Sequence, residues 1–126
     1  MSKYVLDASA VLALLNQEPG MDKVEGILGD SIMSSVNACE VLTKLIDAGM
    51  PIEEARESFD LLGLEVVDFN KELAGRAASL RIATRKKGLS LGDRCCLALG
   101  IDLKLEVVTA EREWAKLKVC PVIIIR

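Results

Sequence analysis

Histidine is absent from the 126-residue sequence, and this absence excludes several kinds of chemistry. Ser-His-Asp and Cys-His catalysis are impossible, and so is any general base built on imidazole. A zinc site would have to use cysteine or carboxylate ligands alone. No two cysteines form a C-x-x-C pair, so a structural zinc ribbon is not expected. We expect small hydrophobic side chains, buried in a protein of a reducing compartment, at Cys39, Cys95, Cys96 and Cys120.

Aromatic residues are also scarce, at 3% of the chain, whereas 51% of it is hydrophobic. The core must therefore be aliphatic, and the chain has the length to bury such a core as a single domain, residues 1–126. The formal net charge of -3 argues against a protein that coats nucleic acid by bulk positive charge. An enzyme with acidic metal ligands and a local basic groove is compatible with that charge.

Long hydrophobic runs are missing too. No apolar stretch approaches the roughly 20 residues of a transmembrane helix. The beginning of the chain lacks the charged start, the long apolar stretch and the small-residue cleavage site of a signal peptide. We therefore expect a soluble protein of the cytoplasm that has no membrane partner.

Short apolar segments alternate with segments of helical periodicity along the whole chain. The predicted strands span residues 4–6, 31–34, 64–67, 106–109 and 122–125. The predicted helices span residues 8–15, 21–28, 35–48, 51–62, 71–84, 91–99 and 112–117. This alternation predicts a three-layer α/β/α fold, in which a central parallel sheet lies between helices. Functional sites in such folds lie at the edge where the strands end.

Acidic residues stand close to those strand ends. Asp7 directly follows the first predicted strand, and Glu111 follows the fourth after a Thr-Ala step. Asp93 lies in the first turn of a predicted helix, and Glu40 lies on the helix after the second strand. If a parallel fold brought the four carboxylates together, a cation would have to neutralise them. Oxygen ligands favour Mg²⁺ or Mn²⁺, which activate water and orient a phosphodiester without any histidine.

Each of these acids also has a purely structural explanation. Asp7 would cap the helix that follows it, and Glu111 would favour the start of another helix. Asp93 would complete a capping box with the serine three positions earlier. Glu40 would pair with the lysine four positions later on its helix. Of the four, Glu40 has the weakest structural explanation, because it follows the helix start by more than a turn and stands beside apolar neighbours.

Four short motifs resemble those of a known family. Residues 4–10 (YVLDASA) look like the opening of PIN domains, and of the VapC toxins of toxin–antitoxin pairs in particular. Residues 37–41 (NACEV) and 89–93 (LSLGD) resemble the second and third motifs of that family. Residues 108–114 (VTAEREW) resemble the fourth, which usually reads Thr-Ala-Asp. The motifs are individually short, but they occur in the right order and span nearly the whole chain.

The resemblance implies a PIN-like fold and a metal-dependent endoribonuclease that hydrolyses RNA phosphodiester bonds with Mg²⁺ or Mn²⁺. It further implies a cognate antitoxin as protein partner and a homodimer. Apolar residues of the helices 21–28 and 51–62 would serve as the dimer interface if they are exposed, but the same residues are equally compatible with the core. It places the catalytic residues and metal ligands at Asp7, Glu40, Asp93 and Glu111.

One acid departs from the family pattern, and two hydroxyl residues match it. Glu111 stands where the family more often has Asp, and its extra methylene would carry the carboxylate ~1.5 Å further out. Since magnesium demands near-ideal geometry, Glu111 would bind through a water molecule or reach the ion by a change of rotamer. Ser9 and Thr109 match hydroxyl positions that border the family's site. Local hydrogen bonding at a helix start is an equally good explanation for both hydroxyls.

The basic residues suggest where RNA would bind. Arg81 and Arg85 are four residues apart and share a helix face, whereas Arg94 and Arg112 each follow a predicted metal ligand directly. A basic edge beside an acidic metal pocket suits a phosphate backbone. These arginines are equally compatible with a solvated surface. No cluster of aromatic residues is available on which RNA bases would stack.

Two other interpretations remain open at this point. Haloacid dehalogenase-type phosphatases also carry an Asp after the first strand, but they continue as Asp-x-Asp, and this chain has Ser9 at the second position. The chain would alternatively be a PIN-fold dimer that binds RNA or a partner and is catalytically weakened by Glu111. The sequence does not identify the RNA target.

Overall fold

A central sheet of parallel strands forms the middle of the molecule, as predicted. The computed structural model of the protein describes all residues from Met1 to Arg126. Its five strands lie in the order β3-β2-β1-β4-β5, and every neighbouring pair is parallel. The strands are β1 (Tyr4–Leu6), β2 (Ser31–Ser34), β3 (Glu65–Val67), β4 (Glu106–Thr109) and β5 (Val122–Ile124).

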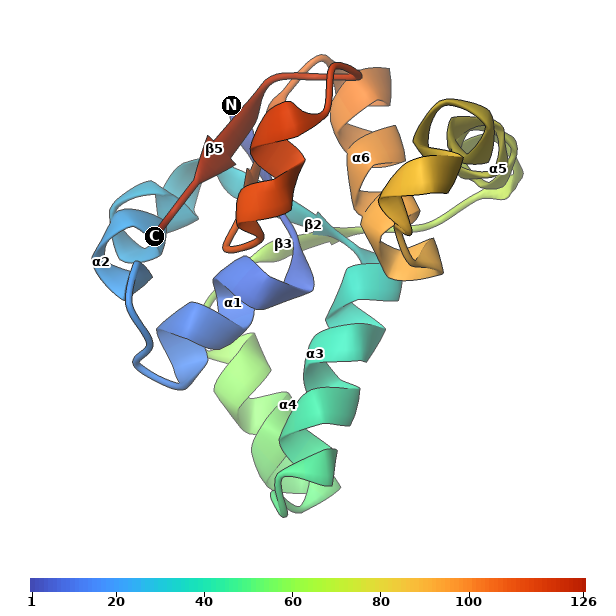
Figure 1. Ribbon diagram of the computed structural model, residues 1–126. Helices are drawn as coiled ribbons and strands as arrows, with labels where there is room; N and C mark the ends of the chain where they lie inside the picture. Colours follow the sequence, from blue (N-terminus) through green and yellow to red (C-terminus); the bar gives the residue numbers. More distant parts are fainter.

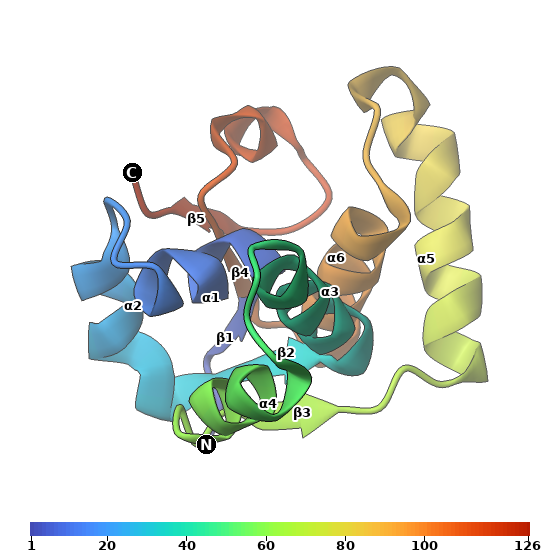
Figure 2. The same cartoon turned by 90° about the horizontal axis from the view of Figure 1, so that it is seen from below.

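Helices cover both faces of this sheet and complete the three layers (Figures 1 and 2). They are α1 (Ala8–Leu15), α2 (Met21–Ile27), α3 (Ser35–Asp47), α4 (Ile52–Asp60), α5 (Lys71–Thr84) and α6 (Leu91–Leu103). Short 3-10 turns lie at Leu28–Asp30, Arg85–Lys87 and Arg112–Lys116. The segment predicted as a short helix at 112–117 is thus the last of these turns.

Alternation along the strands sends the core to both faces. In β1, Val5 packs with α5 and α6, whereas its neighbour Leu6 packs with α1 and α3. In β4, Val107 and Val108 divide between the same two faces. The sheet is therefore buried on both sides, which explains why its strands read as continuous apolar runs rather than as alternating ones.

The helix α6 is longer than the sequence suggested, because it continues past Gly100 to Leu103. A glycine near a helix end often marks a stop, but a Cβ at Gly100 would collide with the side chain of Val107. This glycine therefore allows α6 to press closely against β4. The helix ends instead at Lys104, whose φ of 56° is left-handed.

Two of the four cysteines are fully buried. Cys95 and Cys96 lie in the core, and burial raises the pKa of each thiol. Cys120 is half-buried, and Cys39 is exposed on α3, so the expectation of burial was wrong for Cys39. None of the helices combines the length and the apolar character needed to span a membrane.

The parallel arrangement places the ends of β1, β2 and β4 at one edge of the sheet. The chain enters α1 directly after β1 through Asp7, and α3 directly after β2. The first turns of α1, α3 and α6 approach one another at this edge (Figures 1 and 2). Three helix starts and the end of β4 thus surround a single region.

Candidate active site

Asp7 is held rigidly at the junction between β1 and α1. It is the N-cap of α1, and its Oδ1 accepts a hydrogen bond of 2.9 Å from the backbone N–H of Ala10. The hydroxyl of Ser9 donates to the same carboxylate at 2.8 Å, and that of Thr109 donates at 2.6 Å. The side chain is only 4% exposed. The structural role expected of Asp7 as a cap is therefore real, and it fixes the carboxylate in place.

Burial makes this carboxylate unusually basic. Desolvation raises the pKa of Asp7 from its ordinary 3.8 to about 6, although the hydrogen bonds from Thr109, Ala10 and Ser9 oppose the rise. The negative charge of Asp93 raises the pKa further. A buried carboxylate near a second one is a candidate functional group, because a cation would relieve both penalties.

Ser9 and Thr109 connect α1 with the end of β4. The hydroxyl of Ser9 accepts a hydrogen bond from the backbone N–H of Ala110 at 2.9 Å, and that of Thr109 accepts one from Glu111 at 3.0 Å. Each hydroxyl therefore serves local backbone bonding and the carboxylate of Asp7 at once. Local hydrogen bonding at a helix start and a place at the border of the site are therefore compatible explanations for these two hydroxyls.

Glu40 is positioned by one neighbour on its own helix α3 and by another on α6. The side-chain amide of Asn37 donates to its Oε1 at 3.1 Å. Its carboxylate lies against Gly92, where an added Cβ would collide with Oε1. No ion pair joins Glu40 to Lys44, so the structural explanation proposed for this glutamate does not apply.

Asp93 takes part in the capping box that its sequence position suggested. Its Oδ2 accepts a hydrogen bond of 2.9 Å from the backbone N–H of Ser90, and its own N–H donates to the Ser90 hydroxyl at 3.2 Å. The other carboxylate oxygen makes no hydrogen bond to the protein. The box thus sets the orientation of Asp93 and leaves one oxygen free.

Glu111 differs from the other acids because it is exposed. It is the N-cap of the turn Arg112–Lys116, but its side chain makes no capping hydrogen bond. Its carboxylate is therefore free to move, which suits the longer side chain that distinguishes it from the usual Asp.

The four predicted acids line one pocket of about 290 Å³ at the carboxyl edge of the sheet. Its walls are completed by Ala8, Ser9, Asn37, Lys44 and Ser90. Lys44 is the one basic residue among them. In the sequence, Lys44 has a role only as an ion-pair partner of Glu40, and Asn37 has no apparent role, although both lie about one helical turn from Glu40.

The side-chain oxygens that line this pocket belong to carboxylate, hydroxyl and amide groups, and these are the ligand atoms that a hard divalent cation prefers. No three acidic or cysteine side chains are close enough together to hold an ion directly. Magnesium commonly keeps several of its waters and binds through one or two carboxylates. The pocket therefore fits an ion that is held partly through water by Asp7, Glu40 and Asp93, with Glu111 able to approach.

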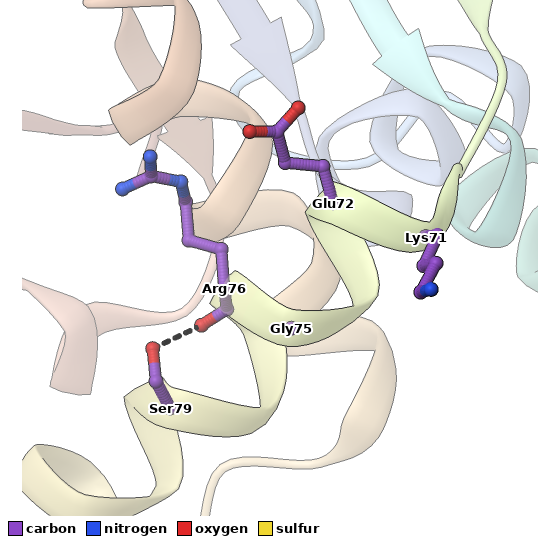
Figure 3. A pocket seen from close by; sticks show the side chains of 5 residues that line it. All are labelled: Lys71, Glu72, Gly75, Arg76 and Ser79. Carbon is purple, nitrogen blue, oxygen red and sulfur yellow. Dashed lines mark hydrogen bonds between the residues drawn. The ribbon is translucent and has the colours of Figure 1, made fainter.

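A larger hollow, of about 640 Å³, lies open on the surface of α5 and lacks these features. Figure 3 shows the Ser79 hydroxyl donating to the Arg76 carbonyl among the five residues that line this hollow, which are Lys71, Glu72, Gly75, Arg76 and Ser79. Arg76 is paired with Asp102 at 3.5 Å. The acidic pocket is therefore the candidate functional site.

None of the four arginines proposed for RNA contact lines the acidic pocket. Arg94 is only 9% exposed, and its guanidinium donates to the carbonyl of Ala77 between α5 and α6, so little of this side chain lies at the surface for contact with RNA. Arg112 is exposed and donates to the Arg126 carbonyl. Arg81 and Arg85 are exposed at the end of α5 and in the turn after it.

Comparison with known structures finds the same fold in toxin–antitoxin proteins. DNA-bound VapBC from Salmonella typhimurium matches with a TM-score of 0.80 and 18% identity, covering 100% of both chains. VapBC2 from Rickettsia felis, bound to a promoter DNA fragment, matches with a TM-score of 0.76 and 18% identity, covering 96% of this chain and 97% of that one. VapBC-5 from Mycobacterium tuberculosis matches with a TM-score of 0.63 and 22% identity, covering 100% and 99%.

No curated protein sequence matches the chain. The family model of the PIN domain, in contrast, matches residues 4–119, which include all four acids of the pocket. The match covers most of the chain and agrees with the order of the strands and helices. The chain belongs to the PIN domain family.

Proposed function

We propose that the protein is a metal-dependent endoribonuclease, and that Asp7, Glu40, Asp93 and Glu111 form its metal site. The observation that carries the proposal is the convergence of these four acids, from four separate segments, on one pocket. Members of the PIN family are typically nucleases that use divalent metal ions. Without histidine, carboxylates are the groups through which such a pocket would bind metal and accept protons.

The chemistry follows from how these side chains are held. A bound Mg²⁺ or Mn²⁺ would polarise the phosphodiester and lower the pKa of a water molecule. Asp7 is fixed by hydrogen bonds from Ser9 and Thr109 and supplies a buried negative charge that favours a cation. Lys44, at the same pocket, would neutralise a phosphate oxygen of the RNA.

We further propose that the protein is the toxin of a toxin–antitoxin pair and acts in the cytoplasm. Support comes from the folds it resembles, since the matching structures include VapBC complexes of toxin and antitoxin. A basic side chain of the antitoxin, such as an arginine, would silence the enzyme by occupying the acidic pocket. Co-purification that recovered no partner at any expression level would contradict this part of the proposal.

A homodimer is part of the same proposal. Leu61 and Ile52 on and after α4 are exposed apolar side chains that would suit an interface. On α2, in contrast, Val24 belongs to the core, so this helix offers less apolar surface than its sequence suggested. Sedimentation of the purified protein tests the dimer directly.

Cleavage of a mixed RNA substrate tests the enzymatic proposal. We expect the wild type to cleave with Mn²⁺ or Mg²⁺ and to stop when a chelator is added, and Asp7→Asn to be inactive. Asp60→Asn is the matched control, because Asp60 is an exposed acid at the end of α4 and should leave cleavage unchanged. Cleavage that persists in Asp7→Asn or in the chelator would contradict the proposed site.

The second candidate function is a PIN-fold protein that binds RNA or a partner without cutting. It is favoured by the exposure of Glu111 and by the absence of three acids grouped tightly enough to hold an ion directly. A folded wild type that neither cleaves RNA nor binds Mn²⁺ would support it. The phosphatase alternative is not retained, since the chain belongs to a different family.

A further inference from the structure

Asn37 occupies an unusual place in the acidic pocket. It lies in the first turn of α3, is 1% exposed and lines the same pocket as the four acids. A buried asparagine needs partners for both its amide group and its carbonyl oxygen, because unpaired polar atoms in the interior cost stability. The partners that it has, and the one that it lacks, indicate what it does.

The side-chain amide of Asn37 connects Glu40 with the first turn of α6, which carries Asp93. Its Nδ2 donates to Oε1 of Glu40 at 3.1 Å and to the carbonyl oxygen of Gly92 at 3.0 Å. Gly92 immediately precedes Asp93 in the first turn of α6. The amide therefore holds Glu40 on α3 at a fixed position relative to Asp93 on α6.

The carbonyl oxygen of Asn37 has no hydrogen-bond partner in the protein. Rotating the amide by half a turn would not help, because Nδ2 would then lose both of its acceptors. With the amide nitrogen fully used, Oδ1 is the polar atom of this side chain left for a ligand. It would add a neutral oxygen to a pocket whose other ligands are carboxylates, which suits the hydration shell of a divalent ion.

We propose that Asn37 is a positioning residue of the metal site. It holds the Glu40 carboxylate in place through Nδ2 and accepts a hydrogen bond from the hydration shell of the ion through Oδ1. The inference rests on the proposed metal-dependent function. It extends that function to a residue that is not itself an acid and makes no charge contribution.

Mn²⁺ binding to the purified protein, measured by calorimetry without RNA, tests this role. Asn37→Leu keeps the number and branching of the side-chain heavy atoms and removes both hydrogen-bonding functions. We expect it to weaken Mn²⁺ binding by about 10–100-fold, the usual effect of losing a residue that orients a metal ligand. The control is Ser31→Ala, which removes a buried hydroxyl bonded to Ile27 at the opposite edge of the sheet and should leave binding unchanged.

A double-mutant cycle separates positioning from general damage to the fold. If Asn37 acts through Glu40, Asn37→Leu should weaken Mn²⁺ binding much less in a Glu40→Gln background than in the wild type. An equal loss in both backgrounds, or no loss in either, would overturn the inference. If Asn37→Leu fails to fold, Asn37→Ala is measured in the same cycle and judged by the same criterion.

The same data distinguish this inference from the function beneath it. A wild type that binds Mn²⁺ and cleaves RNA, together with an Asn37→Leu variant that binds equally well, overturns the role of Asn37 alone. A wild type that binds no Mn²⁺ overturns both. Weakened binding that depends on Glu40 supports both.

Discussion

At the scale of single residues, the buried carboxylate of Asp7 connects stability with function. Its pKa of about 6 in the folded protein lies above the 3.8 of the unfolded chain. A carboxyl group whose pKa is raised by folding stabilises the protein most below pH 4, and this contribution is lost as the pH rises through 6. At neutral pH the metal-free protein therefore carries a buried charge at a cost in stability.

Asp7→Asn should make the metal-free protein more stable at pH 7.5. A pKa difference of about 2 corresponds to roughly 3 kcal/mol, which is the upper limit for the gain. The gain should shrink as the pH falls from 6 to 4, because the wild-type carboxyl then becomes protonated. Urea unfolding of both proteins across this pH range measures the difference. A variant that is less stable than the wild type at pH 7.5 would contradict this account of Asp7.

Gly92 is a second residue whose role is local. It stands in the first turn of α6, where a Cβ would collide with the Glu40 carboxylate. Gly92→Ala should therefore displace Glu40 and reduce cleavage at least tenfold while leaving the fold intact, since alanine favours helices by up to about 1 kcal/mol. Gly75→Ala on α5 is the matched control, because a Cβ there meets nothing within 4 Å. Unchanged cleavage in Gly92→Ala would mean that the position of Glu40 is not critical.

At the scale of elements, α6 matters because it carries Asp93 to the pocket and packs against three strands of the sheet. The approach of α6 to β4 depends on Gly100, since a Cβ there would collide with Val107. The helix is also fixed at its start by the capping box of Ser90 and Asp93. The contact at Gly100 thus sets how closely the end of α6 approaches β4, and the capping box fixes the start of the helix.

Gly100→Ala should destabilise the protein by about 1–3 kcal/mol, the usual cost of inserting a methyl group into a packed interior. The same substitution at Gly75 should instead stabilise the protein by up to about 1 kcal/mol, because only helix propensity changes. Denaturant unfolding of the two variants gives opposite signs if the contact with β4 controls the effect. Stabilisation by both would show that α6 can move away from β4 without cost.

At the scale of the whole molecule, the acidic pocket unites four segments that are distant in the sequence. Asp7 and Glu111 come from the ends of β1 and β4, and Glu40 and Asp93 come from α3 and α6. Their mutual repulsion opposes folding unless a cation is present. The stability of the whole chain should therefore respond to metal.

Mn²⁺ should raise the melting temperature of the wild type at pH 7.5. At a concentration 100 times the dissociation constant, binding adds about 2.7 kcal/mol to the free energy of unfolding. Thermal unfolding with Mn²⁺ and then with excess chelator measures a rise and its reversal, and Asp7→Asn should show little of either. A rise of equal size in Asp7→Asn would place the ion elsewhere on the protein.

Much of this organisation follows from local sequence. The order of strands and helices along the chain is encoded in the short apolar runs and in the helical periodicity that separates them. Asp7 is placed by directly following β1, and Glu111 by following β4 after one alanine. Capping is equally local, so the box formed by Ser90 and Asp93 was predictable. The end of α6 was not, because Gly100 resembles a stop signal until the contact with Val107 is known.

The sequence by itself determined the fold class and the family resemblance and singled out the four acids as candidates, because apolar runs, helical periodicity and cap positions depend on neighbouring residues. Only the tertiary structure decided that Arg94 turns inward to the carbonyl of Ala77, and that Asn37 and Gly92 hold Glu40. The physical reason is that a side chain's partners lie across helix interfaces, where contacts between segments far apart in the chain outweigh local preference. The direction of a side chain is therefore a property of packing rather than of its own segment.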